Sequence, residues 1–282
     1  MGNLTPMIVD EATPPVLRGT DLHLGYHGDL VVHGAGIALT PGTVTALVGP
    51  NGSGKSTLLR ALARLHAPEQ GRITLDDGTD ALALSSKDFA QRVTLLAQSR
   101  PTPTGVSVRD VVGFGRHPYR GRWRATDPDG PAAVAHAMSV TGIEDLGDRC
   151  VDELSGGQLQ RVWLAACLAQ QTGVLLLDEP TTFLDLRYQV EILDLVRDLA
   201  DLHHAAIGLV LHDLDQAAAV ADEVALLDRG RVRAVGPPAD VLTSDLLSDT
   251  YGIEVDVRHD PATGALRTCP RGRHTARLLT AV

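Results

Sequence analysis

The chain has 282 residues, of which 44% are hydrophobic, so it can bury a large core in about one or two domains. Its net charge of −10 disfavours general binding to nucleic acid or to anionic lipid, because both depend on an excess of Lys and Arg. No apolar run approaches the roughly 18 residues of a membrane span, and residues 1–15 lack the basic start and apolar stretch of a secretory signal. We therefore expect a globular protein that stays in the cytoplasm.

Along the chain, short runs rich in leucine and β-branched residues alternate with helical patterns, which is typical of an α/β core. The strands expected in chain order are residues 43–48, 72–75, 92–97, 174–177 and 207–211. Several are apolar throughout, as strands of a mostly parallel sheet covered on both faces are. The stretch 226–232, with Asp228, Arg229 and Gly230 at its centre, predicts a hairpin near the sheet edge.

Between residues 98 and 154 the strand pattern stops, and five prolines interrupt short helical pieces. We expect a helical subdomain there. After about residue 238 we expect a short helical and irregular tail.

Cysteine and histidine usage gives little support to a metal cluster. Cys150, Cys167 and Cys269 are odd in number and widely spaced, so we interpret them as packing residues rather than as a disulfide framework or a CxxC site. Only His203 and His204 are adjacent among the 11 histidines, and no second ligand pair lies at helical spacing from them.

The first chemical motif directly follows an apolar strand at 45–48 and fits the phosphate-binding pattern G-x-x-x-x-G-K-[ST]. Its residues are Gly49, Pro50, Asn51, Gly52, Ser53, Gly54, Lys55, Ser56 and Thr57. The glycines let backbone N–H groups surround a polyphosphate, and a helix expected to begin near Ser56 directs its positive end to the same charge. Lys55, one of only two lysines in the chain, is expected to reach the β- and γ-phosphates, and Ser56 to bind Mg²⁺ with Thr57 beside it. A glycine-rich turn before an ordinary helix is the alternative.

The second motif is a pair of carboxylates, Asp178 and Glu179, at the carboxyl end of the apolar strand 174–177. Ligands of α/β sheets bind at this edge. Neighbouring strand residues point to opposite sides, so Asp178 can hold Mg²⁺ while Glu179 polarises the attacking water. A strand that ends in a charged turn is the alternative.

The third motif, Leu154-Ser155-Gly156-Gly157-Gln158, opens a second helix. Ser155 and Gln158 form a capping-box pattern, and an apolar stripe follows at Leu159, Val162, Trp163 and Ala166. A cap needs no glycine, so the two glycines favour close approach by a ligand. The alternative is a helix that is merely well capped.

These motifs, with Gln98, Leu184, Asp185 and His212 in the same order, resemble the ABC-transporter ATPase family over nearly the whole chain. The resemblance implies a P-loop NTPase (RecA-like) α/β core with a mostly parallel sheet, an antiparallel β edge and an inserted α-helical subdomain. We assign residues 1–98 and 171–240 to the ATP-binding core, 99–170 to the helical subdomain and 241–282 to a C-terminal extension. It further implies an ABC-type transport ATPase that binds ATP and Mg²⁺ and acts as a dimer.

Family resemblance also implies roles for single residues. Gln98 is expected to sense Mg²⁺ and the γ-phosphate, His212 to contact the γ-phosphate and help to position Glu179, and Asp185 to link the two sites. Tyr26, at the end of the first strand, is expected to stack on adenine, with a place in the core as the alternative.

Three residues of the third motif, Ser155, Gly156 and Gln158, are expected to face the γ-phosphate held by the other subunit.

Within the family, the stretches 108–119 and 154–170 resemble importer ATPases for iron(III)-siderophores, with haem and vitamin B12 importers next. The implied partners are transmembrane permease subunits, a second ATPase subunit in a homodimer and, indirectly, an extracytoplasmic substrate-binding protein, at the cytoplasmic face of the membrane. We expect a basic and aromatic cluster to meet the permease, with a solvated loop as the alternative; its members are Arg116, His117, Arg120, Arg122, Trp123 and Arg124.

Two functions of other classes compete with transport. A soluble ABC protein of DNA repair or translation carries long coiled-coil insertions or two linked cassettes, whereas this chain has one cassette and no sustained heptads. A scaffold that binds ATP without hydrolysing it is disfavoured by the presence of Glu179 and His212.

Overall fold

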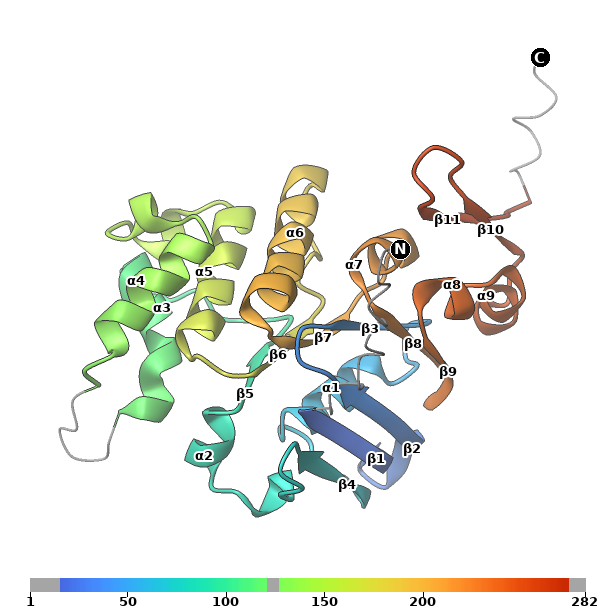
Figure 1. Cartoon of the computed structure of the whole chain (residues 1–282), viewed down its shortest axis with the longest axis horizontal. Coiled ribbons are helices and arrows are strands. Elements are labelled where there is room, and N and C mark those ends of the chain that lie inside the picture. Colours follow the sequence, from blue (N-terminus) through green and yellow to red (C-terminus); the bar gives the residue numbers. More distant parts are fainter. Residues whose placement is uncertain (1–15, 121–126, 274–282) are drawn as a thin grey trace, which may run out of the picture.

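The computed structural model describes residues 16–120 and 127–273, and its centre is a six-stranded sheet with the order β5-β6-β7-β3-β8-β9 (Figure 1). All neighbouring strands are parallel except β8 and β9, which pair antiparallel at one edge. The strands are β3 (Val44–Val48), β5 (Val93–Leu96), β6 (Val174–Asp178), β7 (Ala206–Val210), β8 (Glu223–Asp228) and β9 (Arg231–Gly236). The predicted α/β core with an antiparallel edge is therefore confirmed.

Both faces of this sheet are covered, which explains why β3, β6 and β7 are mostly apolar and buried at every position. Along β6, Leu175 and Leu177 pack in the core that contains α6, whereas Val174 and Leu176 pack in the core that contains α1. In Figure 1 the helices α6 and α7 lie on one side of the sheet and α1 on the other. The helices are α1 (Lys55–Leu62), α6 (Leu186–His203) and α7 (Leu214–Val220).

A second, three-stranded antiparallel sheet with the order β2-β1-β4 packs on the α1 side. Its strands are β1 (Leu17–Tyr26), β2 (Asp29–Leu39) and β4 (Gln70–Leu75). The strand predicted at 72–75 therefore lies in this sheet and not in the parallel one, and the sequence analysis missed β2. The strand β2 alternates buried and exposed residues, the pattern of a half-covered antiparallel strand rather than of an apolar run.

The segment between β5 and β6 is helical, as predicted, and has a hydrophobic cluster of its own, built around Val111, Met138 and Val162 (left side of Figure 1). Its α-helices are α3 (Val108–Gly113), α4 (Gly130–Val140) and α5 (Gly156–Ala169), and short 3₁₀ turns lie at Phe114–Tyr119, Glu144–Leu146 and Val151–Glu153. Before β5, a 3₁₀ turn (Ala81–Ala83) precedes α2 (Ser86–Ala90). The assigned domain boundaries stay a prediction.

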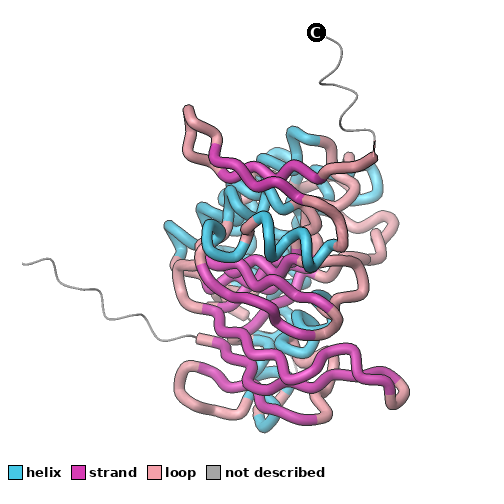
Figure 2. Tube along the Cα trace, turned by 90° about the vertical axis from the view of Figure 1, so that its right-hand side faces the viewer, coloured by secondary structure: helices cyan, strands magenta, loops and turns pink. Residues whose placement is uncertain are grey.

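The C-terminal region contains a β-hairpin that the sequence analysis did not foresee. After α8 (Pro238–Val241) and α9 (Ser244–Tyr251), the strands β10 (Val255–His259) and β11 (Leu266–Pro270) pair antiparallel. The expectation of a helical and irregular tail was therefore wrong for residues 255–270. Figure 2 shows this hairpin at the upper end of the molecule and the β2-β1-β4 sheet at the lower end.

The predicted edge hairpin is confirmed as β8–β9. Its turn consists of Arg229 and Gly230, both with positive φ (46° and 74°), the combination that a two-residue hairpin turn needs.

The cysteine prediction is correct for Cys167, which is buried, and wrong for Cys269, which is exposed on β11.

Candidate functional site

The loop 49–54 connects β3 to α1 and packs closely against strands β8 and β2. A Cβ atom at Gly49 would lie 2.0 Å from the Leu227 carbonyl oxygen of β8, and one at Gly54 would lie 2.8 Å from Val32 of β2. Gly54 is the N-cap of α1 in a left-handed conformation (φ 99°) and supplies no side-chain hydrogen bond to the helix. The first N–H groups of α1 are therefore left for a ligand rather than for a capping side chain.

Lys55 is buried at the start of α1, and its Nζ donates to the carbonyl oxygens of Gly49 (2.8 Å) and Pro50 (2.9 Å). Burial lowers its pKa, and the nearby carboxylates of Glu179 and Asp178 counter this shift. The ammonium group is thus held inside the loop, next to the two acids predicted to share its site.

Asp178, at the end of β6, is 1% exposed and faces α1. Its Oδ1 accepts from Ser56 Oγ at 2.7 Å, and its Oδ2 makes no hydrogen bond, although Arg60 lies 3.4 Å from it. Ser53 Oγ is also buried without a hydrogen-bond partner. Because buried polar atoms are nearly always bonded, these two free atoms indicate a place for a polar ligand.

Glu179 lies just after the end of β6, so the predicted strand alternation does not apply to it, and its partners differ from those of Asp178. Its Oε1 lies 2.6 Å from His212 Nε2, and its Oε2 accepts from Gln98 Nε2 at 2.5 Å and from Thr182 Oγ1 at 3.1 Å. Gln98 is thus brought to Glu179 rather than to Asp178 or Ser56. Glu179 has a positive φ of 54°, a costly conformation for a residue with a side chain, which persists only where its surroundings hold it.

Two contributors to this site were missed by the sequence analysis, although a local signal existed for each. Arg60 lies four residues after Ser56 on α1 and so shares its helical face. Thr182 lies three residues after Glu179 in a turn closed by the Thr182 N–H bond to the Glu179 carbonyl oxygen.

The N-terminus of α5 carries the predicted capping box. Ser155 Oγ accepts from Gln158 N at 3.3 Å, and Gln158 Oε1 accepts from Ser155 N at 3.1 Å. Gly156 is exposed, whereas Gly157 is buried, and a Cβ atom there would lie 2.3 Å from the Tyr188 ring of α6. Close approach at Gly157 is therefore made by Tyr188, and only Gly156 is open to a partner or ligand.

Comparison with known proteins supports the resemblance to ABC-transporter ATPases that the sequence motifs indicated. Residues 32–182 match the family model described as ABC transporter. The chain is 42% identical to the ferric enterobactin transport ATP-binding protein FepC of Escherichia coli over 260 residues, 91% of this chain and 94% of that protein. The chain belongs to the ABC transporter family. It is an ABC-type transport ATPase, and the predicted family membership is confirmed.

Two further matches define its place among ABC transporter proteins. The chain is 42% identical over 254 residues to the cobalamin import ATP-binding protein BtuD of Halobacterium salinarum, 90% of this chain and 63% of that protein. One similar solved structure is described as an inward-facing conformation of a metal-chelate type ABC transporter. It matches with a TM-score of 0.79 and 26% identity, over 92% of this chain and 98% of that chain. Within residues 16–120 and 127–273, no helix is both long and apolar enough to cross a membrane.

Two other predicted ABC residues lie at exposed positions. Tyr26 is 42% exposed at the end of β1 and its ring lies 4.5 Å from that of His66, so the alternative of a core aromatic is wrong. Asp185 is the N-cap of α6 and accepts from Tyr188 N at 3.1 Å.

The basic cluster is divided in a way the sequence analysis did not expect. Arg116 is 2% exposed: it forms a two-pronged ion pair with Asp127 and donates to the Ala169 carbonyl oxygen. The Asp127 bond raises the pKa of Arg116, and Arg116 in turn lowers that of Asp127. Arg116 therefore holds the helical segment together, and its predicted permease contact was wrong. His117 and Arg120 are exposed, and Arg122, Trp123 and Arg124 lie outside the described residues.

Proposed function

We propose that this chain hydrolyses ATP to power the import of iron(III)-siderophore complexes. The observation that carries the hydrolytic part is the contact of Glu179 with both His212 and Gln98, beside a loop that buries Lys55. The cargo rests on kinship with the ferric enterobactin protein, and the cobalamin protein supports vitamin B12 as the alternative.

In this proposal each part of the site has a separate task. The loop from Gly49 to Thr57 binds the phosphates of ATP, and Tyr26 stacks on its adenine. Ser56 and Asp178 would hold Mg²⁺, since hydroxyl and carboxylate oxygens are ligands that it prefers. Gln98, expected to bind the same ion, contacts Glu179 instead. When bound, Mg²⁺ neutralises charge on the phosphates.

Glu179 acts on the attacking water. A carboxylate that already accepts hydrogen bonds from Gln98 and Thr182 is held in one orientation and can accept a proton from water without first reorganising. His212, at 2.6 Å from Oε1, fixes the other carboxylate oxygen, and in this proposal it also contacts the γ-phosphate.

The site is completed by a second copy of the chain. Ser155, Gly156 and Gln158, on an exposed helix N-terminus, face the γ-phosphate bound by the partner's loop, and Asp185 links the two sites. Gly157 supports this end of α5 by admitting Tyr188.

Transmembrane permease subunits are the second partner, and an extracytoplasmic substrate-binding protein takes part indirectly. A surface of exposed Phe114, His117 and Arg120 beside a cavity of about 830 Å³ in the helical segment has the aromatic and basic character common at interfaces. The chain would thus sit at the cytoplasmic face of the membrane through the permease.

The hydrolytic role is tested with Glu179→Gln in the full chain. ATP affinity should stay within about twofold of wild type, because phosphate binding lies elsewhere, while hydrolysis falls by about 10²- to 10⁴-fold. Phosphate release and calorimetric titration with Mg-ATP measure the two quantities. Near-normal turnover would remove Glu179 from the reaction.

The cargo is tested in two steps: the chain is copurified with its permease from its own cells, and the chain is then depleted from those cells. ATP-dependent uptake of a labelled iron(III)-siderophore should then be lost, whereas loss of cobalamin or haem uptake alone would overturn the assigned cargo. The same copurification with Arg120→Glu should recover less permease, and full recovery would exclude this surface.

A further inference from the structure

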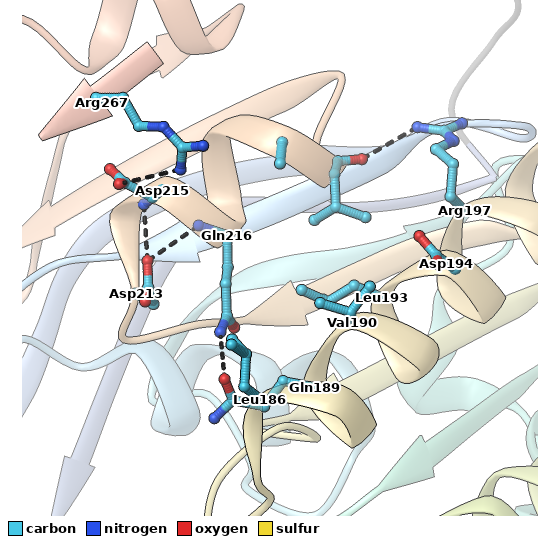
Figure 3. A pocket seen from close by; sticks show the side chains of 12 residues that line it. Leu186, Gln189, Val190, Leu193, Asp194, Arg197, Asp213, Asp215, Gln216 and Arg267 are labelled. Carbon is cyan, nitrogen blue, oxygen red and sulfur yellow. Dashed lines mark hydrogen bonds and ion pairs between the residues drawn. The ribbon is translucent and has the colours of Figure 1, made fainter. Parts of the chain in front are cut away.

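Glu179 and His212 are called the candidate catalytic dyad below. An amide pair, Gln189 of α6 and Gln216 of α7, connects the chain segments that carry these two residues (Figure 3). Gln216 Nε2 donates to Gln189 Oε1 at 2.9 Å. Gln216 Oε1 accepts from Thr181 Oγ1 at 3.2 Å, and Gln189 Nε2 donates to the carbonyl oxygens of Leu184 (3.1 Å) and Thr181 (3.4 Å). Both amides are half-buried and use donor and acceptor atoms alike.

Each end of this bridge lies close in sequence to a dyad residue. Thr181 follows Glu179 by two positions, and α7 begins just after His212. Asp213 caps α7 by accepting from the N–H groups of Asp215 and Gln216, so the position of Gln216 is rigidly tied to that of His212. A cavity of about 130 Å³ is lined by Glu179, His212 and both amides.

The outer side of α7 is held independently. Asp215 Oδ1 accepts from Thr268 N (2.8 Å) and Thr268 Oγ1 (2.9 Å) of β11, and Arg267 lies 3.6 Å from its Oδ2, as Figure 3 shows for the Arg267 pair. The C-terminal hairpin thus anchors α7 from one side. The amide pair links α7 to the Glu179 segment from the other.

We propose that Gln189 and Gln216 are positioning residues that set the distance between His212 and the Glu179 carboxylate. The proposal rests on the catalytic roles proposed above for those two residues. Glu179 has a strained backbone, and the segment after it is irregular, so cross-links from neighbouring helices decide where the carboxylate lies. Misplacement by about 1 Å at a reacting group costs up to roughly 100-fold in rate.

A double-mutant cycle on the full chain tests the pairing. Gln189→Leu and Gln216→Leu should each lower kcat about tenfold with the KM for ATP within about twofold of wild type. The kcat of the double variant should be no lower than that of the less active single variant, because either change breaks the same bridge. Gln91→Leu is the matched control: Gln91 is also half-buried, and its amide donates to the Pro118 carbonyl oxygen far along the chain from the dyad.

An isosteric variant separates hydrogen bonding from packing. In Gln216→Glu an ionised carboxylate cannot donate to Gln189, whereas the protonated form can. An ordinary glutamate pKa of about 4.3 leaves this carboxyl group ionised at pH 8, so the activity relative to wild type should be low there. Charged or titratable groups facing position 216 from all neighbouring elements are Glu179, Asp194, Arg197, His212, Asp213, Asp215 and Arg267. The carboxylates among them raise the pKa of a carboxyl group placed there, and Arg197 and Arg267 lower it.

Two results would overturn the proposal: single leucine variants with wild-type kcat, or losses that multiply to about 100-fold in the double variant. A Gln216→Glu variant with wild-type kcat at pH 8 would do so as well. Normal turnover by Glu179→Gln would instead refute the proposed hydrolytic role, so the two failures are distinguishable. Thermal unfolding of each variant identifies any that fails to fold.

Discussion

The helices α1 and α5 both begin at glycine-containing loops, yet their N-termini are built in opposite ways. The start of α1 is buried, its N-cap is a left-handed glycine without a side-chain bond, and Lys55 is enclosed by the loop. The start of α5 is exposed, and its capping box satisfies the N–H groups of Ser155 and Gln158.

The difference indicates which helix end binds nucleotide by itself. An uncapped, buried N-terminus leaves N–H groups and positive charge that a phosphate can satisfy. A capped, exposed N-terminus is stable alone and meets a ligand only when another surface brings one. We therefore expect changes at α1 to affect ATP binding and changes at α5 to affect hydrolysis without affecting binding.

Ser155→Arg should separate the two helix ends most sharply. Hydrolysis should fall by about 10²- to 10³-fold, because the bulky side chain blocks the donors that α5 offers to the other subunit's γ-phosphate. The affinity of the chain for Mg-ATP, measured by calorimetric titration, should stay within about twofold of wild type. A large loss of affinity would mean that α5 serves the nucleotide of its own chain.

Lys55→Ala should have the reverse effect. Removal of the buried ammonium group should weaken Mg-ATP binding by roughly 10- to 100-fold, since hydrogen bonds to charged groups contribute about 1.5–3 kcal/mol. The other lysine, Lys87, is exposed on α2, so Lys87→Ala is the matched control and should bind normally. Equal affinities for both variants would contradict the assignment of the loop.

Mixing the two variants tests whether α1 and α5 combine across a dimer. Lys55→Ala and Ser155→Arg, each in a Glu179→Gln background, should trap little ATP alone. In a mixed dimer one site carries both lesions and the other carries neither, so one ATP is trapped; random pairing makes about half of the dimers mixed. No increase on mixing, with subunit exchange shown independently, would refute the shared site.

The smallest expected effect distinguishes the two glycines of α5. Gly157→Ala would place a Cβ atom 2.3 Å from the Tyr188 ring and should destabilise the chain by about 1–3 kcal/mol. At Gly156 the nearest atom would be 3.9 Å away, so Gly156→Ala should change stability by less than about 1 kcal/mol. Chemical denaturation measures both, and equal losses would mean that Tyr188 moves aside without cost.

Local sequence determined the parts of the site that depend on one short segment. The phosphate-binding loop, the Ser155–Gln158 capping box and the β8–β9 turn follow from glycine, capping and turn chemistry within a few residues. The apolar strand before Asp178 and Glu179 was equally evident, since burial on both faces requires an unbroken apolar run. The order of these motifs then sufficed for the family.

Only the tertiary structure decided which distant residues meet. Arg116 looked like an interface residue because its sequence neighbours are basic, yet Asp127 and the Ala169 carbonyl oxygen bury it. Gly157 looked open until Tyr188 of α6 was found over it, and the bridge from Gln216 to Gln189 spans 27 positions. Such contacts depend on how helices pack on the sheet, and side chains that sequence separates by tens of residues carry no local signal of their partners.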